Sequence, residues 1–368
     1  MREEGHGLSE TKIYRHPNGD NRHNKTTRQI KVGELKIGGG APVSVQSMTN
    51  TPTHDIDKTA AQINALKEAG ADLVRMAVPD MKAASALKEI RRQTEIPLVA
   101  DVHFDHKLAL KSVDFVDKIR INPGNIGGAD NVRTVADALN ERGIPIRIGV
   151  NAGSLPIKLK RLPPAQALAE AALTHVRLLE DAGFYNTVIS VKSSDVRVTL
   201  DANRILAECT EYPLHLGVTE AGIAVPGLIK SSACLGALLL DGIGDTIRIS
   251  LSGDPVKEIE AGRLLLNSLG LRRDMPEVAS CPMCGRTEID VAELAERVYE
   301  TVKGLKKPLK IAVMGCVVNG IGESEHADLG VCGGKEHSLL FLRGKKLKTV
   351  NNADILPELL RLAEEYTL

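Results

Sequence analysis

The chain has 368 residues, is 43% hydrophobic and only 2% aromatic, and carries no formal net charge at pH 7. This length and composition predict one large domain or two ordinary ones with a sizeable core. The few aromatic rings argue against base stacking, and the balanced charge argues against a global attraction to nucleic acid or membrane. Neither is therefore expected as a partner.

The start of the chain is polar, and no later segment forms a long apolar run. This pattern predicts a cytoplasmic protein with neither a signal peptide nor a membrane span. In a reducing compartment, the six Cys indicate metal binding or redox chemistry rather than a disulfide framework.

Residues 1–29 are interpreted as a polar tail without an assigned role, and residues 30–270 alternate between strand and helix patterns. Strands are predicted at 43–48, 73–78, 98–104, 118–122, 146–151, 187–193, 214–219 and 246–251. Helices with apolar residues at three- and four-residue spacing are predicted between these strands, for example at 59–68, 82–92, 131–141, 165–182 and 256–269. Eight such units predict an α/β fold, a (β/α)₈ TIM barrel. The alternative is an open doubly wound sheet, which is disfavoured because no Gly-x-Gly-x-x-Gly fingerprint follows the first strand.

The pattern changes at residue 271, and residues 271–368 predict a small α+β domain. A helix is expected at 291–304, a strand at 310–314 and a glycine-rich turn at Asn319–Gly322. Further strands are expected near Leu329 and at 338–343, followed by a hairpin at Gly344-Lys345 and a closing helix at 356–366.

Catalytic groups of TIM barrels lie at the carboxyl ends of the strands, where this chain carries cations. The five cations are Arg75, Arg120, Arg147, Lys192 and Arg248. Because alternate residues of a strand share a face, polar residues should accompany them, namely Asn122, Asn151, Ser250 and Ser252. Thr219, at the end of another predicted strand, is a further candidate for binding the substrate. A converging ring of cations needs anions to pair with, and guanidinium groups suit phosphate oxygens. We therefore expect a substrate with at least one phosphate, two being favoured. In the alternative, these cations lie outside the barrel and pair with helix carboxylates.

Three residues at predicted strand ends are candidate acid or base groups. Asp101 shares a face with His103, and Glu220 directly follows Thr219. Each could transfer protons or bind a substrate hydroxyl. Each could equally form a structural pair with a neighbouring polar group.

The last quarter of the chain carries a metal-binding pattern. Cys281 and Cys284 form a C-x-x-C pair, and Cys316 ends a later strand. Such thiolates hold either structural zinc or an iron–sulfur cluster, and the fourth ligand is open between Cys332 and Glu323. The turn at Asn319–Gly322 would offer backbone N–H groups to cluster sulfides or phosphate. The two remaining residues, Cys209 and Cys234, fall in helical segments and are interpreted as small buried hydrophobes.

Six motifs together resemble the 4-hydroxy-3-methylbut-2-enyl diphosphate synthase family, from about Thr27 to the C-terminus. They are Val45–Thr49, Asp101–Asp105, Lys118–Gly127, Leu214–Gly222, Cys281–Arg286 and Met314–Glu323. The resemblance is to the two-domain bacterial form, since the chain has no room for the large domain inserted in plant members.

The resemblance implies a [4Fe-4S] cluster held by Cys281, Cys284, Cys316 and Glu323, with Cys332 left as a structural residue. It implies the substrate 2-C-methyl-D-erythritol 2,4-cyclodiphosphate, opened by two-electron reduction with loss of water to 4-hydroxy-3-methylbut-2-enyl diphosphate. It also implies reduced ferredoxin or flavodoxin as electron donor, and a homodimer in which the cluster domain of one subunit covers the barrel of the other. The chain departs from the family pattern at Ile321, which replaces a proline and so loses a fixed φ in the predicted ligand turn.

The resulting hypothesis gives Glu323 the role of a replaceable iron ligand, because carboxylate binds iron less firmly than thiolate. Glu220 is the first candidate for proton delivery, followed by Asp101 and His103. Two rival classes remain: a zinc-stabilised lyase or aldolase with Lys192 as a Schiff-base residue, and a non-catalytic iron–sulfur sensor. The basic stretch Arg343–Lys348 is interpreted as a solvated hairpin, with the docking of an acidic electron carrier as the alternative.

Overall fold

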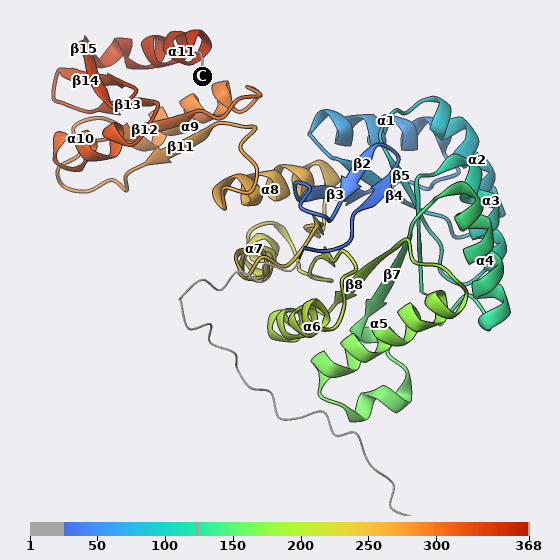
Figure 1. Ribbon diagram of the computed structural model, residues 1–368. Coiled ribbons are helices and arrows are strands. Elements are labelled where there is room, and N and C mark those ends of the chain that lie inside the picture. Colours follow the sequence, from blue (N-terminus) through green and yellow to red (C-terminus); the bar gives the residue numbers. More distant parts are fainter. Residues whose placement is uncertain (1–25, 123–124, 367–368) are drawn as a thin grey trace, which may run out of the picture. The chain divides into compact units, whose positions relative to one another are not determined.

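The computed structural model describes residues 26–122 and 125–366, which form two compact units dividing between Leu265 and Leu266 (Figure 1). Most of the predicted tail, residues 1–25, lies outside the described residues. The division lies close to the boundary predicted at residue 270. Each unit has its own sheet and its own helices.

The first unit is built on an eight-stranded parallel sheet, with the strand order β8-β7-β6-β5-β4-β3-β10-β9. A single bridge between Ile189 and Leu214 joins the two ends of this order and nearly closes the sheet into a barrel. The strands are β3 (Ser44–Met48), β4 (Leu73–Ala77), β5 (Leu98–Asp101), β6 (Lys118–Ile121), β7 (Ile146–Asn151), β8 (Thr187–Lys192), β9 (His215–Leu216) and β10 (Thr246–Ile247). The predicted TIM-barrel architecture is confirmed.

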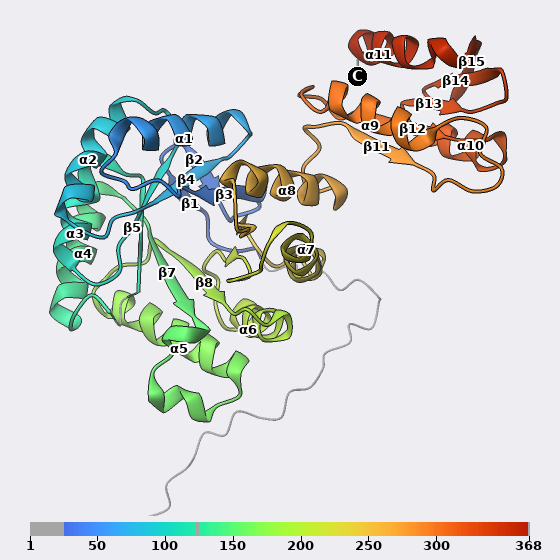
Figure 2. The same ribbon diagram turned by 180° about the vertical axis from the view of Figure 1, so that it is seen from behind.

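The helices of this unit surround the strands, as the two opposite views show (Figures 1 and 2). They are α1 (Ile56–Glu68), α2 (Met81–Arg92), α3 (His106–Ser112), α4 (Ala129–Arg142), α5 (Pro164–Asp181), α6 (Val196–Cys209), α7 (Ala224–Leu240) and α8 (Pro255–Ser268). Four of them begin after an Asp whose carboxylate accepts a hydrogen bond from a backbone N–H of the first turn, and the caps are Asp55, Asp80, Asp105 and Asp195. Such caps satisfy N–H groups that the helix itself leaves unpaired and so fix where each helix starts.

A two-stranded hairpin, β1 (Ile30–Val32) and β2 (Leu35–Ile37), precedes the barrel. Its fully buried Val32 and Ile37 pack against Leu73 and Val99, which lie in the amino-terminal halves of β4 and β5. The hairpin therefore covers apolar side chains at the end of the barrel opposite to the predicted site. The sequence patterns above did not predict it.

The second unit has a five-stranded mixed sheet whose order follows the chain. Its strands are β11 (Glu277–Ser280), β12 (Lys310–Met314), β13 (Leu329–Cys332), β14 (His337–Leu342) and β15 (Lys345–Asn351), the first three parallel and the last three antiparallel. Helices α9 (Val291–Val302) and α11 (Ile355–Glu365) share an apolar core with one face of this sheet. Helix α10 (Val317–Glu325) packs on the other face, where Gly320 lies against Met314 and Cys332.

Several local predictions were wrong, and the predicted strands 98–104, 214–219 and 246–251 are shorter than expected. The expected turn at Asn319–Gly322 lies inside α10, so Ile321 is a helical residue and not part of a ligand turn. The hairpin between β14 and β15 turns at Arg343 and Gly344, both with positive φ, one residue earlier than predicted. Cys234 is buried as expected, but Cys209 is exposed at the end of α6.

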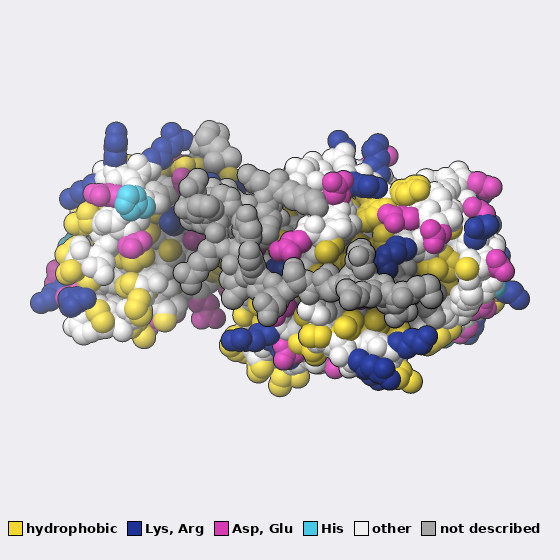
Figure 3. Space-filling view, turned by 60° about the horizontal axis from the view of Figure 1, so that its bottom comes forward, with side chains coloured by type: hydrophobic (Ala, Val, Ile, Leu, Met, Phe, Trp, Pro, Cys, Tyr) yellow, Lys and Arg dark blue, Asp and Glu magenta, His cyan; other side chains and the backbone are white. Residues whose placement is uncertain are grey.

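Acidic and basic side chains are interspersed on the face drawn in Figure 3, where the described residues show no extended patch of one sign. Among the described residues, no helix combines the length and the apolar character that crossing a membrane requires.

Candidate functional site

A polar cavity of about 110 Å³ lies at the carboxyl ends of the barrel strands. Its lining residues are Arg75, Asp101, His103, Arg120, Arg147, Gly149, Asn151, Ser190, Lys192, Thr219, Arg248 and Ser250. The structure therefore brings together all five predicted cations from five different strands or strand ends. It also brings Asp101, His103, Asn151, Thr219 and Ser250 to the same cavity.

Three predicted site residues do not line this cavity: Asn122, Glu220 and Ser252. Asn122 is buried just beyond β6, whereas Glu220 and Ser252 are exposed beyond β9 and β10. Glu220 has a φ of +51°, which is uncommon for a residue with a side chain. In contrast, Ser190 lines the cavity without having been predicted. Strand parity could have found it, because it shares a face with Lys192.

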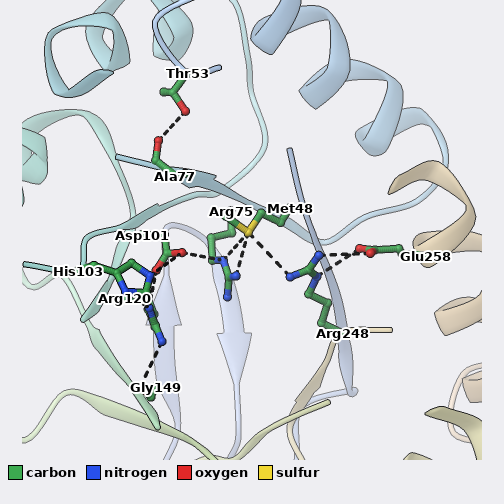
Figure 4. A network of polar contacts seen from close by, with 10 residues as sticks. All are labelled: Met48, Thr53, Arg75, Ala77, Asp101, His103, Arg120, Gly149, Arg248 and Glu258. Carbon is green, nitrogen blue, oxygen red and sulfur yellow. Dashed lines mark hydrogen bonds and ion pairs between the residues drawn. The ribbon is translucent and has the colours of Figure 1, made fainter. Parts of the chain in front are cut away.

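Asp101 is the acidic centre of one half of the cavity (Figure 4). Its carboxylate lies 3.0 Å from Arg120 Nη1, 3.6 Å from Arg75 Nε and 3.5 Å from His103 Nε2. Burial raises the pKa of Asp101, but the charge of Arg75, the hydrogen bond with His103 and the charge of Arg120 together hold this pKa well below its usual range. Asp101 is therefore an anion that orients two arginines, and it is a poor proton donor.

Arg248, in the other half of the cavity, is held by Glu258 from the first turn of α8 (Figure 4). Its Nε and Nη2 each lie 3.2 Å from an oxygen of Glu258, which is only 3% exposed. The same carboxylate accepts hydrogen bonds from the Ser47 hydroxyl at 2.7 Å and from the Leu251 N–H at 3.0 Å. Sequence reasoning missed Glu258, because nothing distinguishes it from the other carboxylates of the helices.

The interior has more cations than these two carboxylates can balance. Lys118, which precedes Arg120 on the same face of β6, is fully buried and its Nζ has no hydrogen-bond partner among the described residues. Arg147 is 1% exposed, and its Nε and Nη1 also lack partners in that part of the chain. Burial, followed by the charge of neighbouring cations, holds the pKa values of Lys118, Arg147 and Lys192 well below their usual ranges. Burial likewise lowers the pKa of Arg75, to about 10.

Two inward-facing glycines make room for these cations. A Cβ atom on Gly149 would collide with the guanidinium of Arg120, and one on Gly217 would lie 2.6 Å from Lys192 Nζ. Six cations thus face two carboxylates in the interior, counting Lys118 below the cavity. Such an excess of desolvated positive charge suits a multiply charged anion.

The second unit places two of the three predicted thiol ligands at one edge of its sheet. Cys281 directly follows β11, and Cys316 follows β12 as the N-cap residue of α10. These strands are parallel neighbours, so both residues lie at the carboxyl edge of the sheet. The Gly315 N–H lies 3.3 Å from Cys281 Sγ, and the Cys281 N–H donates to the carbonyl of Val313.

The loop from Cys281 to Glu288 returns to the same edge, because the Glu288 N–H donates to the carbonyl of Gly315 at 2.8 Å. Cys284 lies in this loop and is exposed. A backbone hydrogen bond from Arg286 lowers the pKa of its thiol, which favours the thiolate. Glu323 is exposed on α10, seven residues after Cys316 and so on nearly the same face of the helix.

Cys332 differs from the other candidate ligands. It is fully buried, burial raises the pKa of its thiol, and its Sγ lies 3.4 Å from the Ser324 hydroxyl. No group of three His, Cys, Asp or Glu among the described residues is arranged so that it could hold a metal ion. The donor set nevertheless fits an iron–sulfur cluster in its chemistry. Two of its thiols lie at one sheet edge, the third thiol has a lowered pKa, and a backbone N–H is directed at a sulfur.

Fold and site together define a TIM-barrel enzyme with a cation-rich cavity and a second domain that carries two thiols at one edge of its sheet. Two family models match the chain: the GcpE TIM-barrel domain at residues 27–263 and the GcpE protein C-terminal domain at residues 277–365. The chain belongs to the GcpE family, which confirms the family predicted from the motifs.

Relatives with high identity span nearly the whole chain. The 4-hydroxy-3-methylbut-2-en-1-yl diphosphate synthase (flavodoxin) of Caldanaerobacter subterraneus subsp. tengcongensis is 54% identical over 346 residues, covering 93% of this chain and 97% of the relative. The protein of the same name from Clostridium perfringens is 51% identical over 344 residues, covering 92% and 99%. Among solved structures, the dihydropteroate synthase of Yersinia pestis matches 66% of this chain and 98% of its own, with a TM-score of 0.49 and 14% identity.

Proposed function

We propose that this protein reduces 2-C-methyl-D-erythritol 2,4-cyclodiphosphate to 4-hydroxy-3-methylbut-2-enyl diphosphate, with ring opening and loss of water, in isoprenoid precursor biosynthesis. The observation that carries the proposal is the cavity in which five cations converge, in a chain whose relatives bear the name of this synthase. A cyclic diphosphate is small and multiply charged, as this cavity requires.

The cavity residues act by binding and orienting the substrate. Arg75, Arg120, Arg147, Lys192 and Arg248 bind the phosphate oxygens, because guanidinium and ammonium groups pair with phosphate through charge-assisted hydrogen bonds. Asn151, Thr219 and Ser250 contact the substrate hydroxyls or phosphates from the same strand faces. Asn122 and Ser252, which lie beyond the ends of β6 and β10, are proposed as further substrate-binding residues outside the cavity lining.

The departing hydroxyl needs a proton, and we propose Glu220 as its first source. Its left-handed backbone conformation is costly for a glutamate, and such strain gathers at functional positions. His103 is the second candidate, because it lines the cavity and contacts both Asp101 and Arg120. Asp101 is the third candidate, because its lowered pKa makes it a poor proton donor.

Cys281, Cys284, Cys316 and Glu323 would hold a [4Fe-4S] cluster in the second unit. When bound, the cluster supplies electrons singly and offers Lewis acidity at the iron whose carboxylate ligand can be replaced. The chain's own contribution is the N–H of Gly315 directed at Cys281 and the lowered pKa of Cys284. The buried thiol of Cys332 remains structural.

We propose reduced flavodoxin or ferredoxin as the electron donor, the cytoplasm as the compartment, and a homodimer in which each cluster domain serves the barrel of its partner. The donor is supported by the names of the relatives, which specify flavodoxin. Basic side chains of β15, including Lys345 and Lys346, are exposed. We interpret them as solvated residues of the hairpin and assign them no role in docking the electron carrier.

Anaerobic purification tests the cluster and the reaction together. We expect a brown protein with iron and sulfide in equal amounts that turns over the cyclic diphosphate with a chemical reductant. A colourless zinc protein would support the rival lyase or aldolase with Lys192 as Schiff-base residue. A fully loaded cluster without turnover would support a sensor instead.

Glu323→Ala tests the replaceable ligand. We expect poorer iron retention and a loss of turnover of about ten-fold or more, since each 1.4 kcal/mol of lost transition-state stabilisation is a factor of ten. Glu325→Ala is the control, because Glu325 is also exposed and belongs to the same helix. Wild-type iron content and turnover in Glu323→Ala would remove Glu323 from the ligand set.

A further inference from the structure

The sulfur of Met48 lies between two arginines of the cavity (Figure 4). Met48 is the last residue of β3 and pairs directly with Arg75 of β4 in the register of the sheet. Arg75 donates to Met48 Sδ from Nε at 3.0 Å and from Nη2 at 2.8 Å. Arg248 Nη1 approaches the same sulfur at 3.8 Å. One thioether thus contacts both guanidinium groups.

The two arginines differ in how closely a carboxylate holds each of them. Arg248 is held by two hydrogen bonds to Glu258. Arg75 has its next acceptor, a carboxylate oxygen of Asp101, only at 3.6 Å from Nε. The side chain of Arg75 is 14% exposed, so water contributes little to its orientation. The sulfur of Met48 is therefore the nearest acceptor that fixes where the Arg75 guanidinium points.

We propose that Met48 is a positioning residue of the anion site, whose sulfur holds Arg75 beside Arg248 in the orientation that a bound diphosphate needs. The inference rests on the proposed function, since it assigns the diphosphate to these arginines. Met48 contacts the two guanidiniums and acts on the substrate through them.

A thioether suits this role for an electrostatic reason. It is neutral and a weak acceptor, so it can orient a guanidinium and still release it to phosphate oxygens. A carboxylate in its place would orient Arg75 more firmly but would cancel one of the positive charges that attract the substrate. An aliphatic side chain would leave the buried donors unpaired, and Arg75 would turn toward Asp101 and away from Arg248.

The test compares three variants of the full-length, cluster-loaded protein. Met48→Leu keeps the size of the side chain and removes the acceptor, whereas Met48→Gln keeps a neutral acceptor at similar reach. Met76→Leu is the matched control, because Met76 is fully buried on β4 and faces away from the cavity, next to the inward-facing Arg75. The measurements are kcat and KM for the cyclic diphosphate, and the Kd of inorganic pyrophosphate by calorimetry.

We expect Met48→Leu to raise KM and the pyrophosphate Kd by about five-fold, the value of one ordinary hydrogen bond, with kcat within about two-fold of wild type. Met48→Gln should restore most of the affinity, and Met76→Leu should leave both constants unchanged. If Met48 had only a structural role, Met48→Leu would lower folding stability without raising KM selectively over kcat. Alternatively, Met76→Leu would change KM and the pyrophosphate Kd by the same amount.

Wild-type KM and pyrophosphate affinity in Met48→Leu would overturn the inference while leaving the proposed function intact. An unaltered defect in Met48→Gln would also overturn it, because the acceptor would then not matter. Failure of the wild-type protein to turn over the cyclic diphosphate would reject the proposed function itself, and the pyrophosphate titrations would still decide the role of Met48 in anion binding.

Discussion

Some individual residues of the barrel interior carry charge that is unfavourable for folding stability. A buried cation without a partner is costly, and Lys118 is both fully buried and without a hydrogen-bond partner among the described residues. It lies outside the cavity lining, so its charge acts on the substrate only from a distance. Its removal should therefore affect stability more than binding geometry.

Lys118→Met is expected to stabilise the barrel at pH 7 by about 1–3 kcal/mol, as replacing buried charge by apolar groups commonly does. Because burial lowers the pKa of Lys118 in the folded protein below its ordinary value of 10.5, the unfolded chain binds more protons between those two values. The stability of the wild type therefore rises with pH in that window, and the advantage of the variant shrinks as the pH approaches 10.

Urea unfolding of the barrel transition at pH 7, 8 and 9 measures this difference. Exposed Lys36 provides the control, since Lys36→Met should show no such trend. A Lys118→Met protein that is less stable than wild type at pH 7 would contradict the expectation.

At the scale of elements, helix α10 links the buried sheet to the proposed cluster ligands. It begins after Cys316, carries Glu323, and packs against the sheet through Gly320, where a Cβ would lie 2.8 Å from Cys332 Sγ. Gly322 lies two residues later in the same helix and has no atom within 4 Å of its Cβ position. Alanine substitutions at these two glycines can therefore be compared directly, because they differ in the space around the added Cβ.

Gly320→Ala should push α10 away from β12 and β13, destabilise the second unit by about 1–3 kcal/mol and reduce iron retention, because overpacking is costly. Gly322→Ala should be neutral or stabilise by about 0.5–1 kcal/mol, since alanine favours a helix interior over glycine. Thermal unfolding and iron analysis of both variants distinguish these outcomes. Equal behaviour of the two variants would show that the close packing of Gly320 is unimportant.

The elements that sequence patterns predict well are those with strong local signals. Strands β7 and β12 have the predicted bounds, because each repeats a branched apolar residue at every second position: Ile146, Ile148 and Val150 in β7, and Ile311 and Val313 in β12. Helix α10 was missed because two glycines indicate a turn, whereas packing against Cys332 overrides that local preference. Strands β9 and β10 are much shorter than predicted, with two residues each.

The residues of the candidate site can be divided in the same way, into those with a local sequence signal and those that depend on long-range contacts. Position near the ends of predicted strands identified the cations, and strand parity identified polar residues beside them, because both are local properties of the sequence. The carboxylate of Glu258 and the sulfur of Met48 could not be predicted, since each meets its arginine only after folding. Met48 and Arg248, for instance, are 200 residues apart in the chain.

At the scale of the whole molecule, the two units have separate cores and separate proposed ligands. A ligand stabilises only the unit that binds it, by an amount that grows with its concentration above Kd. Calorimetry of the full-length protein should therefore show two transitions. Pyrophosphate at about 100 Kd should stabilise the barrel by about 2.7 kcal/mol, while iron–sulfur loading should raise the transition of the second unit. A single transition that responds to both ligands would show that the units unfold together.

The cations of the barrel interior also have a consequence for which anions the protein admits. Formal charge sums to zero over the chain, yet among the described residues six interior cations face two interior carboxylates. Five of these cations line a cavity of about 110 Å³. A long polyanion cannot bring its charges into such a space, whereas a compact one can. The barrel therefore acts as a filter by size as well as by charge, and an abundant polymer such as RNA does not compete with a small metabolite for its positive charge.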